Sequence, residues 1–139
     1  MSALENASLS FLSAIDTESG LDAVLFLRRT GSVLASWTRD GIRLDVVSVM
    51  AATLLASVDT IVEALGGPSS RSISVTSGDR QIVATKLGSQ AFLFVVAPRS
   101  VSPRYVRKAV RELVGRLTAA SAMTLLRFQP RSSKVEAKP

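Results

Sequence analysis

Residues 42–65, IRLDVVSVMAATLLASVDTIVEAL, are the most informative segment of this chain about its fold. Their aliphatic side chains are too many to share one helical stripe, so a helix here is apolar on more than one side. A helix that is apolar nearly all round needs a second covering surface besides its own core. Its uncharged centre, residues 46–58, is shorter than the roughly twenty residues that a bilayer span requires. We therefore expect one side of this helix to contact a sheet and another side to contact a second protein chain.

Five strand-like segments flank this helix. Residues 22–29 (DAVLFLRR) and 90–97 (QAFLFVVA) are apolar almost throughout, which predicts central strands buried on both faces. Residues 71–77 (RSISVTS) alternate strictly between polar and apolar side chains, as a half-exposed strand does. The other two strands are predicted at 32–38 and 80–87, and the short turns at Thr30-Gly31, Gly78-Asp79 and Gly88-Ser89 make sequential strands antiparallel.

Two more helices are predicted, one at each end of the sheet-forming region. The first has Leu4, Ser8, Phe11, Leu12 and Ile15 at spacings of three and four and ends at Ser19-Gly20. The last begins with Ser102 as N-cap and Pro103 in the first helical position, and it extends to about Leu126. Its predicted inward stripe is Val106, Ala109, Val110, Leu113 and Leu117.

The predicted fold class is therefore α/β, of the α+β sandwich type. The element order is α-β-β-α-β-β-β-α, with a five-stranded antiparallel sheet and helices on its faces. We expect residues 1–128 to form one domain and residues 129–139 to form a disordered basic tail. The first residues contain no basic segment followed by an apolar run, so we expect a cytoplasmic protein without a signal peptide.

The residue inventory argues against an enzyme. The 139 residues include no Cys and no His, so thiolate metal sites and Ser-His-Asp arrangements are excluded. The sequence contains no phosphate-binding glycine loop of the Walker type, and we expect neither a cofactor nor a metal. Asp59 and Glu63 lie four residues apart and could form an acid–base pair, although the solvated edge of a helix is the favoured interpretation.

Positive charge is concentrated after Pro98. The chain up to Pro98 carries a net charge of −2, and the remainder carries +8. We define the basic surface as Arg104, Arg107, Lys108 and Arg111, which fall on one face of the last predicted helix. Such a face binds an acidic protein or an anionic membrane, or is simply solvated. Few aromatic residues accompany it, so sequence-specific nucleic acid is the least favoured partner. The tail adds Arg127, Arg131, Lys134 and Lys138.

The order of elements resembles the Roadblock / dynein light-chain family. The resemblance covers roughly residues 4–126 and rests on an apolar strand followed by GSVLA (31–35), the long second helix, and GDR (78–80) ahead of strands ending in FLFVV (92–96). It implies a non-enzymatic module that pairs as a homodimer or heterodimer through the second helix and third strand. Members serve Ras-like small GTPases as activators, regulators or scaffolds in signalling, and in prokaryotes they often accompany a GTPase of the gliding-motility type.

The resemblance also implies where partners bind. The dimer interface would use the second helix and third strand, and a Ras-like GTPase would contact the outer part of the helix through Ser57, Thr60, Glu63 and Ala64. The alternative is a profilin-like or sensory sheet domain that binds a small ligand or an anionic surface and does not act on a GTPase. The predicted interface residues are Val49, Met50, Thr53, Leu54, Ser57, Val58, Ile61, Ser72, Ile73, Ser74, Val75 and Thr76.

Overall fold

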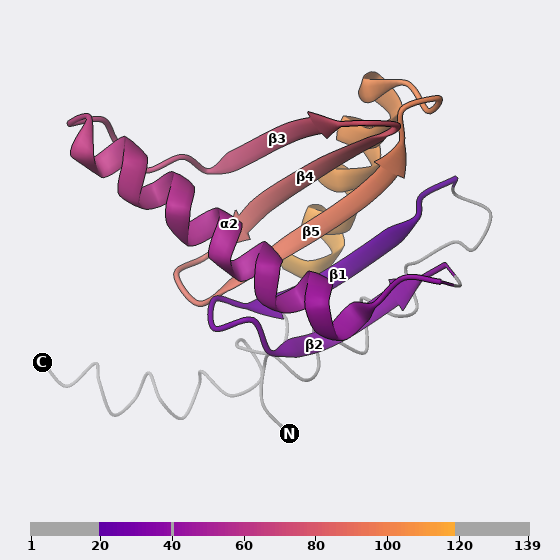
Figure 1. Ribbon diagram of the computed structural model, residues 1–139, viewed down its shortest axis with the longest axis horizontal. Helices are drawn as coiled ribbons and strands as arrows, with labels where there is room; N and C mark the ends of the chain where they lie inside the picture. The colour runs from indigo at the N-terminus through magenta and orange to yellow at the C-terminus, as the bar shows by residue number, and fades with distance from the viewer. Residues whose placement is uncertain (1–19, 40, 119–139) are drawn as a thin grey trace, which may run out of the picture.

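The computed structural model describes residues 20–39 and 41–118, and within these ranges the chain forms one five-stranded antiparallel sheet (Figure 1). The strand order across the sheet is β2-β1-β5-β4-β3, so β2 and β3 are its edges. This confirms the predicted fold class. The strands are β1 (Ala23–Arg28), β2 (Val33–Thr38), β3 (Ser72–Ser77), β4 (Arg80–Leu87) and β5 (Ala91–Pro98).

The two continuously apolar segments form central strands, as predicted. β5 lies between β1 and β4, and its residues from Ala91 to Ala97 are all buried. In β1, Val24 and Phe26 belong to the core on one face of the sheet, while Leu25 and Leu27 belong to the core on the other. Because strand side chains alternate between faces, a strand between two apolar layers must be apolar at every position.

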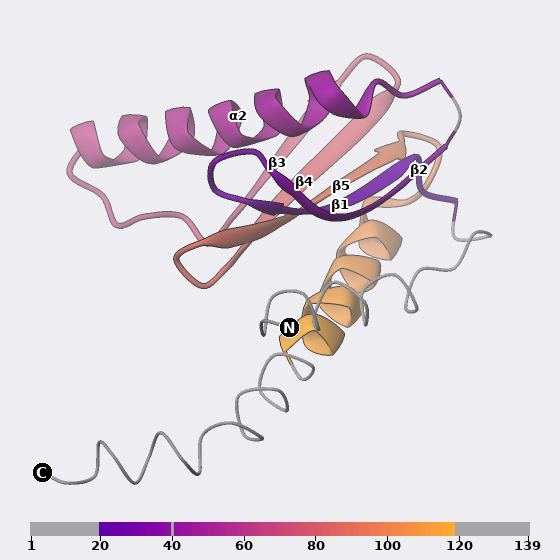
Figure 2. The ribbon, with the colours of Figure 1, turned by 90° about the horizontal axis from the view of Figure 1, so that it is seen from below.

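A helix covers each face of the sheet (Figure 2). α2 (Leu44–Ala64) crosses one face, and the helix of residues 103–118 packs on the other through Val106, Val110, Leu113 and Leu117. Ser102 caps this C-terminal helix as predicted, since its hydroxyl accepts a 3.1 Å hydrogen bond from the Tyr105 amide. The predicted N-terminal helix, the extension to Leu126 and the tail lie outside the described residues.

The predicted end of the long helix is confirmed at Gly66-Gly67. Gly66 has a φ of +80°, and its amide donates to the Glu63 carbonyl while the Gly67 amide donates to the Val62 carbonyl, both at 3.0 Å. This pair of bonds is the Schellman arrangement, which requires a left-handed residue directly after the helix.

The three turns between sequential strands are each predicted to have two residues, but two of them are longer. The Gly78-Asp79 turn has two residues as expected, whereas β4 and β5 are joined by residues 88–90. The β1–β2 connection is residues 29–32, and its tip packs on α2. A Cβ atom at Gly31 would lie 3.4 Å from the Val49 Cα atom, so glycine permits the close approach of this turn to the helix.

Candidate interaction surfaces

α2 has a buried side and an exposed apolar side. Ser48, Ala51, Ala52 and Leu55 are buried against the sheet, which is the first of the two predicted contacts. The opposite side exposes large side chains, for which the exposed fractions are 43% for Val46, 55% for Val49, 55% for Met50, 58% for Ile61 and 80% for Leu65. Thr53 and Ser57 are also exposed on this side, but monomeric proteins seldom expose so many large apolar side chains on one side of a helix.

Most of the helix residues predicted for the dimer interface lie on this exposed side. Val49, Met50, Thr53, Ser57 and Ile61 are exposed, whereas Leu54 and Val58 are partly buried. Leu54 packs against the core between α2 and the sheet, so it also supports the fold. Val46 and Leu65 are equally exposed but are absent from the predicted set, although the helical period of four from Val46 to Met50 could have identified the first of them.

The edge strand β3 lies beside the C-terminal half of α2 in Figure 1. Its residues pair with β4 from Ser72 opposite Thr85 to Ser77 opposite Arg80. The Lys86 amide donates to the Arg71 carbonyl at 2.9 Å, which makes 71 and 86 a hydrogen-bonded pair. Because antiparallel pairs alternate, the amides of residues 72, 74 and 76 point away from β4 toward the free edge. Ile73 and Val75 are partly buried, and Ser72, Ser74 and Thr76 are exposed.

Asp59 is an ion-paired anchor of α2, so the favoured interpretation of Asp59 as a solvated helix edge is wrong. Its carboxylate accepts hydrogen bonds of 2.8 Å from both Lys86 on β4 and Arg29 after β1. The hydrogen bond from Lys86, assisted by the charges of both cations, lowers the pKa of Asp59 below its usual value. The sequence distance to these cations hides the pairing from local pattern analysis.

Asp59 is therefore a poor general acid, because its lowered pKa keeps it ionised near neutral pH. Glu63 is exposed, so the two carboxylates have different surroundings. Thr60 and Glu63, both predicted to contact a GTPase, line a polar hollow of about 210 Å³ with Asp59, and Ser57 and Ala64 are exposed on the same helix. Within the described residues, no group of three or more His, Cys, Asp or Glu side chains is placed to hold a metal ion.

By length and composition alone, α2 would be able to cross a membrane. This corrects the sequence argument that it is too short, which counted only the uncharged centre. The fold uses the helix differently, because Ala51, Ala52 and Leu55 pack on the sheet and Asp59 is paired with two cations.

The basic surface lies on the other side of the molecule. Arg104, Arg107, Lys108 and Arg111 are all exposed on the C-terminal helix, across the sheet from α2 (Figure 2). The two candidate surfaces are therefore separated by the thickness of the sheet, and a partner on one leaves the other accessible. The tail cations lie outside the described residues.

Solved structures that share this fold include three of MglB proteins. The gliding protein MglB of Thermus thermophilus gives a TM-score of 0.71 at 17% identity, with 88% of this chain and 94% of that chain covered. Myxococcus xanthus MglB gives a TM-score of 0.69 at 14% identity, with 84% of this chain and 86% of that chain covered. An MglB with a tetrameric arrangement gives a TM-score of 0.70 at 17% identity, with 88% of this chain and 93% of that chain covered.

The comparison with curated proteins gives no match. The family model of the Roadblock/LC7 domain matches residues 10–97, which include all of the described sheet except Pro98. Proteins with this domain are in general regulatory and non-catalytic. The chain belongs to the Roadblock/LC7 domain family.

Proposed function

We propose that this chain forms a dimer that binds and regulates a Ras-like small GTPase, as an activator or an adaptor. The observation that carries the proposal is the exposed apolar side of α2 beside the unpaired edge of β3. Family membership and the likeness in fold to MglB proteins, one of them in a tetrameric arrangement, support a regulator that works as an oligomer.

The dimer would join two sheets into one. Two copies of β3 would pair through the outward amides of residues 72, 74 and 76, and two copies of α2 would cover the exposed Val49, Met50 and Ile61. This pairing removes a free strand edge and an apolar stripe at once. Obligate dimers commonly bury about 2,000 Å² or more, which requires both elements rather than one.

The GTPase would contact the C-terminal part of α2 and the adjacent loop. Thr60 and Glu63 line the polar hollow there, and Ser57 and Ala64 are exposed on the same helix. Such a surface supplies polar contacts without a nucleophile or a metal site, which suits a protein that positions or reshapes the catalytic residues of its partner.

Two measurements test this proposal in sequence. Light scattering coupled to size exclusion at micromolar concentration should give about twice the 14.8 kDa chain mass. A monomer would contradict the dimer and favour the profilin-like alternative. The purified dimer is then immobilised and incubated with cell extract in the presence of GTP or of GDP. It should retain a small GTPase in one of the two nucleotide states. If a GTPase is retained, its hydrolysis rate with and without the dimer separates an activator from an adaptor.

We also propose an anionic partner for the basic surface and a cytoplasmic location for the whole assembly. Four exposed cations within about two helical turns create a local positive field that attracts acidic proteins or anionic lipids. Because this surface lies across the sheet from α2, the anionic partner and the GTPase would bind at the same time.

A further inference from the structure

A groove separates the C-terminal helix from strands β3 and β4, on the face of the sheet opposite α2. Its volume is about 500 Å³, which is within the range of sites that hold small organic molecules. Its apolar part is formed by Val83, Val110 and Val114, and hydroxyl groups of the two strands line the remaining side: Ser72, Ser74 and Thr85.

Three arginines border this groove. Arg71 comes from the residue before β3, and Arg107 and Arg111 come from successive turns of the C-terminal helix. All three are exposed, and within the described residues none of their side chains forms an ion pair or a hydrogen bond. Three like charges beside an apolar floor raise the local positive potential, which an anionic group bound among them would lower.

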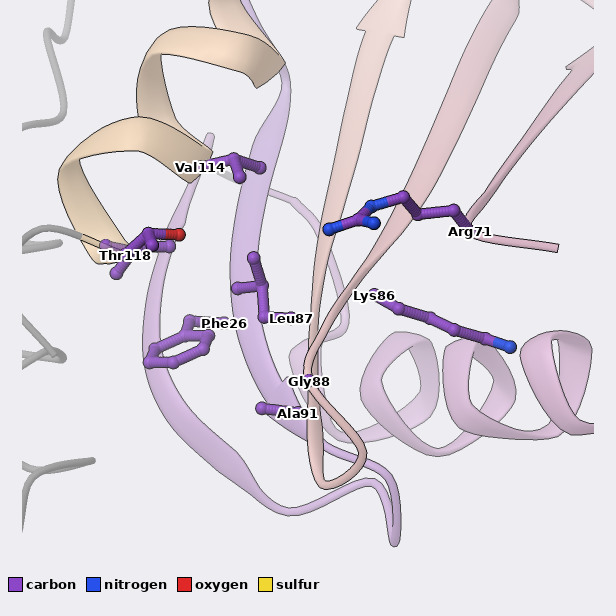
Figure 3. A pocket seen from close by; sticks show the side chains of 9 residues that line it. Phe26, Arg71, Lys86, Leu87, Gly88, Ala91, Val114 and Thr118 are labelled. Carbon is purple, nitrogen blue, oxygen red and sulfur yellow. The ribbon is translucent and has the colours of Figure 1, made fainter. Parts of the chain in front are cut away.

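The groove continues along the helix. A second hollow of about 280 Å³ shares Arg71 and Val114 with it and extends to Leu117 and Thr118. In Figure 3 the guanidinium of Arg71 extends toward the Val114 side, whereas Lys86 from β4 extends the opposite way. The guanidinium of Arg71 is therefore placed on the groove side, although Arg71 also lines a neighbouring hollow with Arg29, whereas the ammonium group of Lys86 is paired with Asp59.

The shape and charge of the groove specify the chemistry of its ligand. Arg107 and Thr118 are eleven positions apart in the helix, which corresponds to about 16 Å along the helix axis. A ligand that satisfies this groove needs a negative group for the arginines and an extended apolar portion for the valines. A purely acidic peptide satisfies the arginines but makes no use of the apolar floor. Nucleic acid needs exposed aromatic side chains for stacking, whereas Phe26, which lines the continuation of the groove, is only 2% exposed.

We propose that this groove binds an anionic phospholipid of a membrane surface, with the phosphate among Arg71, Arg107 and Arg111 and the start of an acyl chain over Val83 and Val110. The proposal rests on, and makes specific, the anionic partner proposed for the basic surface. Arg104 and Lys108 lie outside the groove on the same helix and would contact neighbouring headgroups of the leaflet. The exposed side of α2 lies on the other face of the sheet, so lipid binding leaves it accessible to the second copy of the chain.

Gly115 provides a variant that blocks the groove. It lines the groove from the helix, and a Cβ atom added there meets no atom within 4 Å, so a larger side chain fits the fold and fills the groove. Gly115→Leu is the blocking variant and Gly115→Ala its matched control. For charge, Arg71→Gln and Arg111→Gln remove groove cations, and Arg116→Gln removes an exposed cation of the same helix that does not line the groove.

The experiment is co-sedimentation of the full-length protein with vesicles of phosphatidylglycerol and phosphatidylcholine, and of phosphatidylcholine alone, at physiological salt. We expect binding to the anionic vesicles only. Arg71→Gln and Arg111→Gln should each weaken it about fivefold. Gly115→Leu should weaken it about tenfold by excluding about two buried methylene groups, and Gly115→Ala and Arg116→Gln should bind within about twofold of the unchanged protein.

Several results would overturn the proposal. If the protein does not bind anionic vesicles, both the proposed lipid ligand and the proposed binding groove are wrong. In a second case, Gly115→Leu binds vesicles as well as the unchanged protein does, and all cation variants weaken binding equally. The protein would then attach through the whole helix surface, which contradicts binding in the groove but still agrees with an anionic partner. Tighter binding of monomeric oleate, polyglutamate or DNA than of anionic vesicles identifies a soluble ligand instead. Retention of the GTPase by the Gly115→Leu protein is measured in a separate pull-down assay. The lipid proposal and the proposed regulatory function can therefore be contradicted independently of each other.

Discussion

The ammonium group of Lys86 on β4 lies 2.8 Å from the carboxylate of Asp59 on α2, and it ties the second half of the helix to the sheet. Arg29 completes the cluster from the β1–β2 turn, also at 2.8 Å. Both Asp59 and Lys86 are largely shielded from solvent, with side-chain exposures of 21% and 14%. The cluster therefore links the second half of α2 both to β4 and to the β1–β2 turn.

Removing Lys86 should destabilise the fold. Lys86→Met keeps the aliphatic part of the side chain but leaves Asp59 with Arg29 as its cation, and we expect a loss of about 1 kcal/mol in the free energy of unfolding. Urea unfolding at a fixed protein concentration measures it. The control is Arg43→Met, which removes the exposed Arg43–Asp45 pair and should change stability by at most a few tenths of a kcal/mol.

The same cluster makes stability depend on pH in the acid range. The pKa of Asp59 is lower in the folded protein than in the unfolded chain, so folding favours the ionised form. This contribution is fully present above the unfolded pKa of about 3.9 and is lost as the pH falls through the folded value. Asp59→Asn should therefore reduce the fall of the unfolding midpoint as the pH is lowered from about 5 into the acid range. An unchanged slope would mean that other carboxylates govern acid unfolding.

A charge on the exposed side of α2 should dissociate the proposed dimer without unfolding the monomer. Met50 is 55% exposed, so Met50→Asp places a carboxylate in solvent in the monomer but in an apolar contact in the dimer. Light scattering should show the mass falling from two chains to one, with the circular dichroism spectrum retained. Val33→Asp is the matched control, because Val33 is 40% exposed on the opposite edge strand β2.

Proline at Ser74 tests the strand pairing separately from the helix. The Ser74 amide points toward the free edge, so Ser74→Pro removes no hydrogen bond between β3 and β4. We expect dissociation of the dimer, again measured by light scattering. Ile73→Pro removes an amide that pairs with β4, and it should instead unfold the edge of the sheet. A Ser74→Pro protein that remains dimeric would show that β3 is not at the interface.

Two glycines should respond to alanine in opposite directions. Gly66→Ala forces a left-handed residue at the end of α2, where φ is +80°, and should cost about 1 kcal/mol. Gly115→Ala lies inside the C-terminal helix with open space around the new Cβ atom and should stabilise the fold by about 0.5–1 kcal/mol. Thermal unfolding of both variants measures the difference. Equal effects would contradict the helix-end geometry at Gly66.

Reversing the charge of Glu63 should weaken the proposed GTPase contact. Glu63 is exposed at the end of α2 and forms no ion pair with the described residues, so Glu63→Lys should leave the fold and the dimer intact. In the pull-down assay it should retain less GTPase than the unchanged dimer. Asp45→Lys, an exposed charge reversal at the other end of the same helix, is the control and should retain the GTPase fully.

Features that depend on neighbouring residues can be predicted from the amino-acid pattern of this chain. The apolar runs place β1 and β5 in the centre of the sheet, Ser102 begins the C-terminal helix, and Gly66 ends α2. Each follows from a backbone or side-chain preference that acts within a few residues. The excess of apolar residues in α2 likewise predicts a second apolar side, and that side is exposed in the folded chain.

Contacts between groups that are distant in the chain depend instead on the three-dimensional arrangement. The local pattern favours a solvated helix edge for Asp59 because its cations are 30 and 27 residues away. The groove likewise exists because the placement of β3 beside β4 brings Arg71 to the helix that carries Arg107 and Arg111. Such pairings depend on strand order and on how helices cross the sheet. These are set by the packing of the whole core and leave no periodic signal in the local sequence.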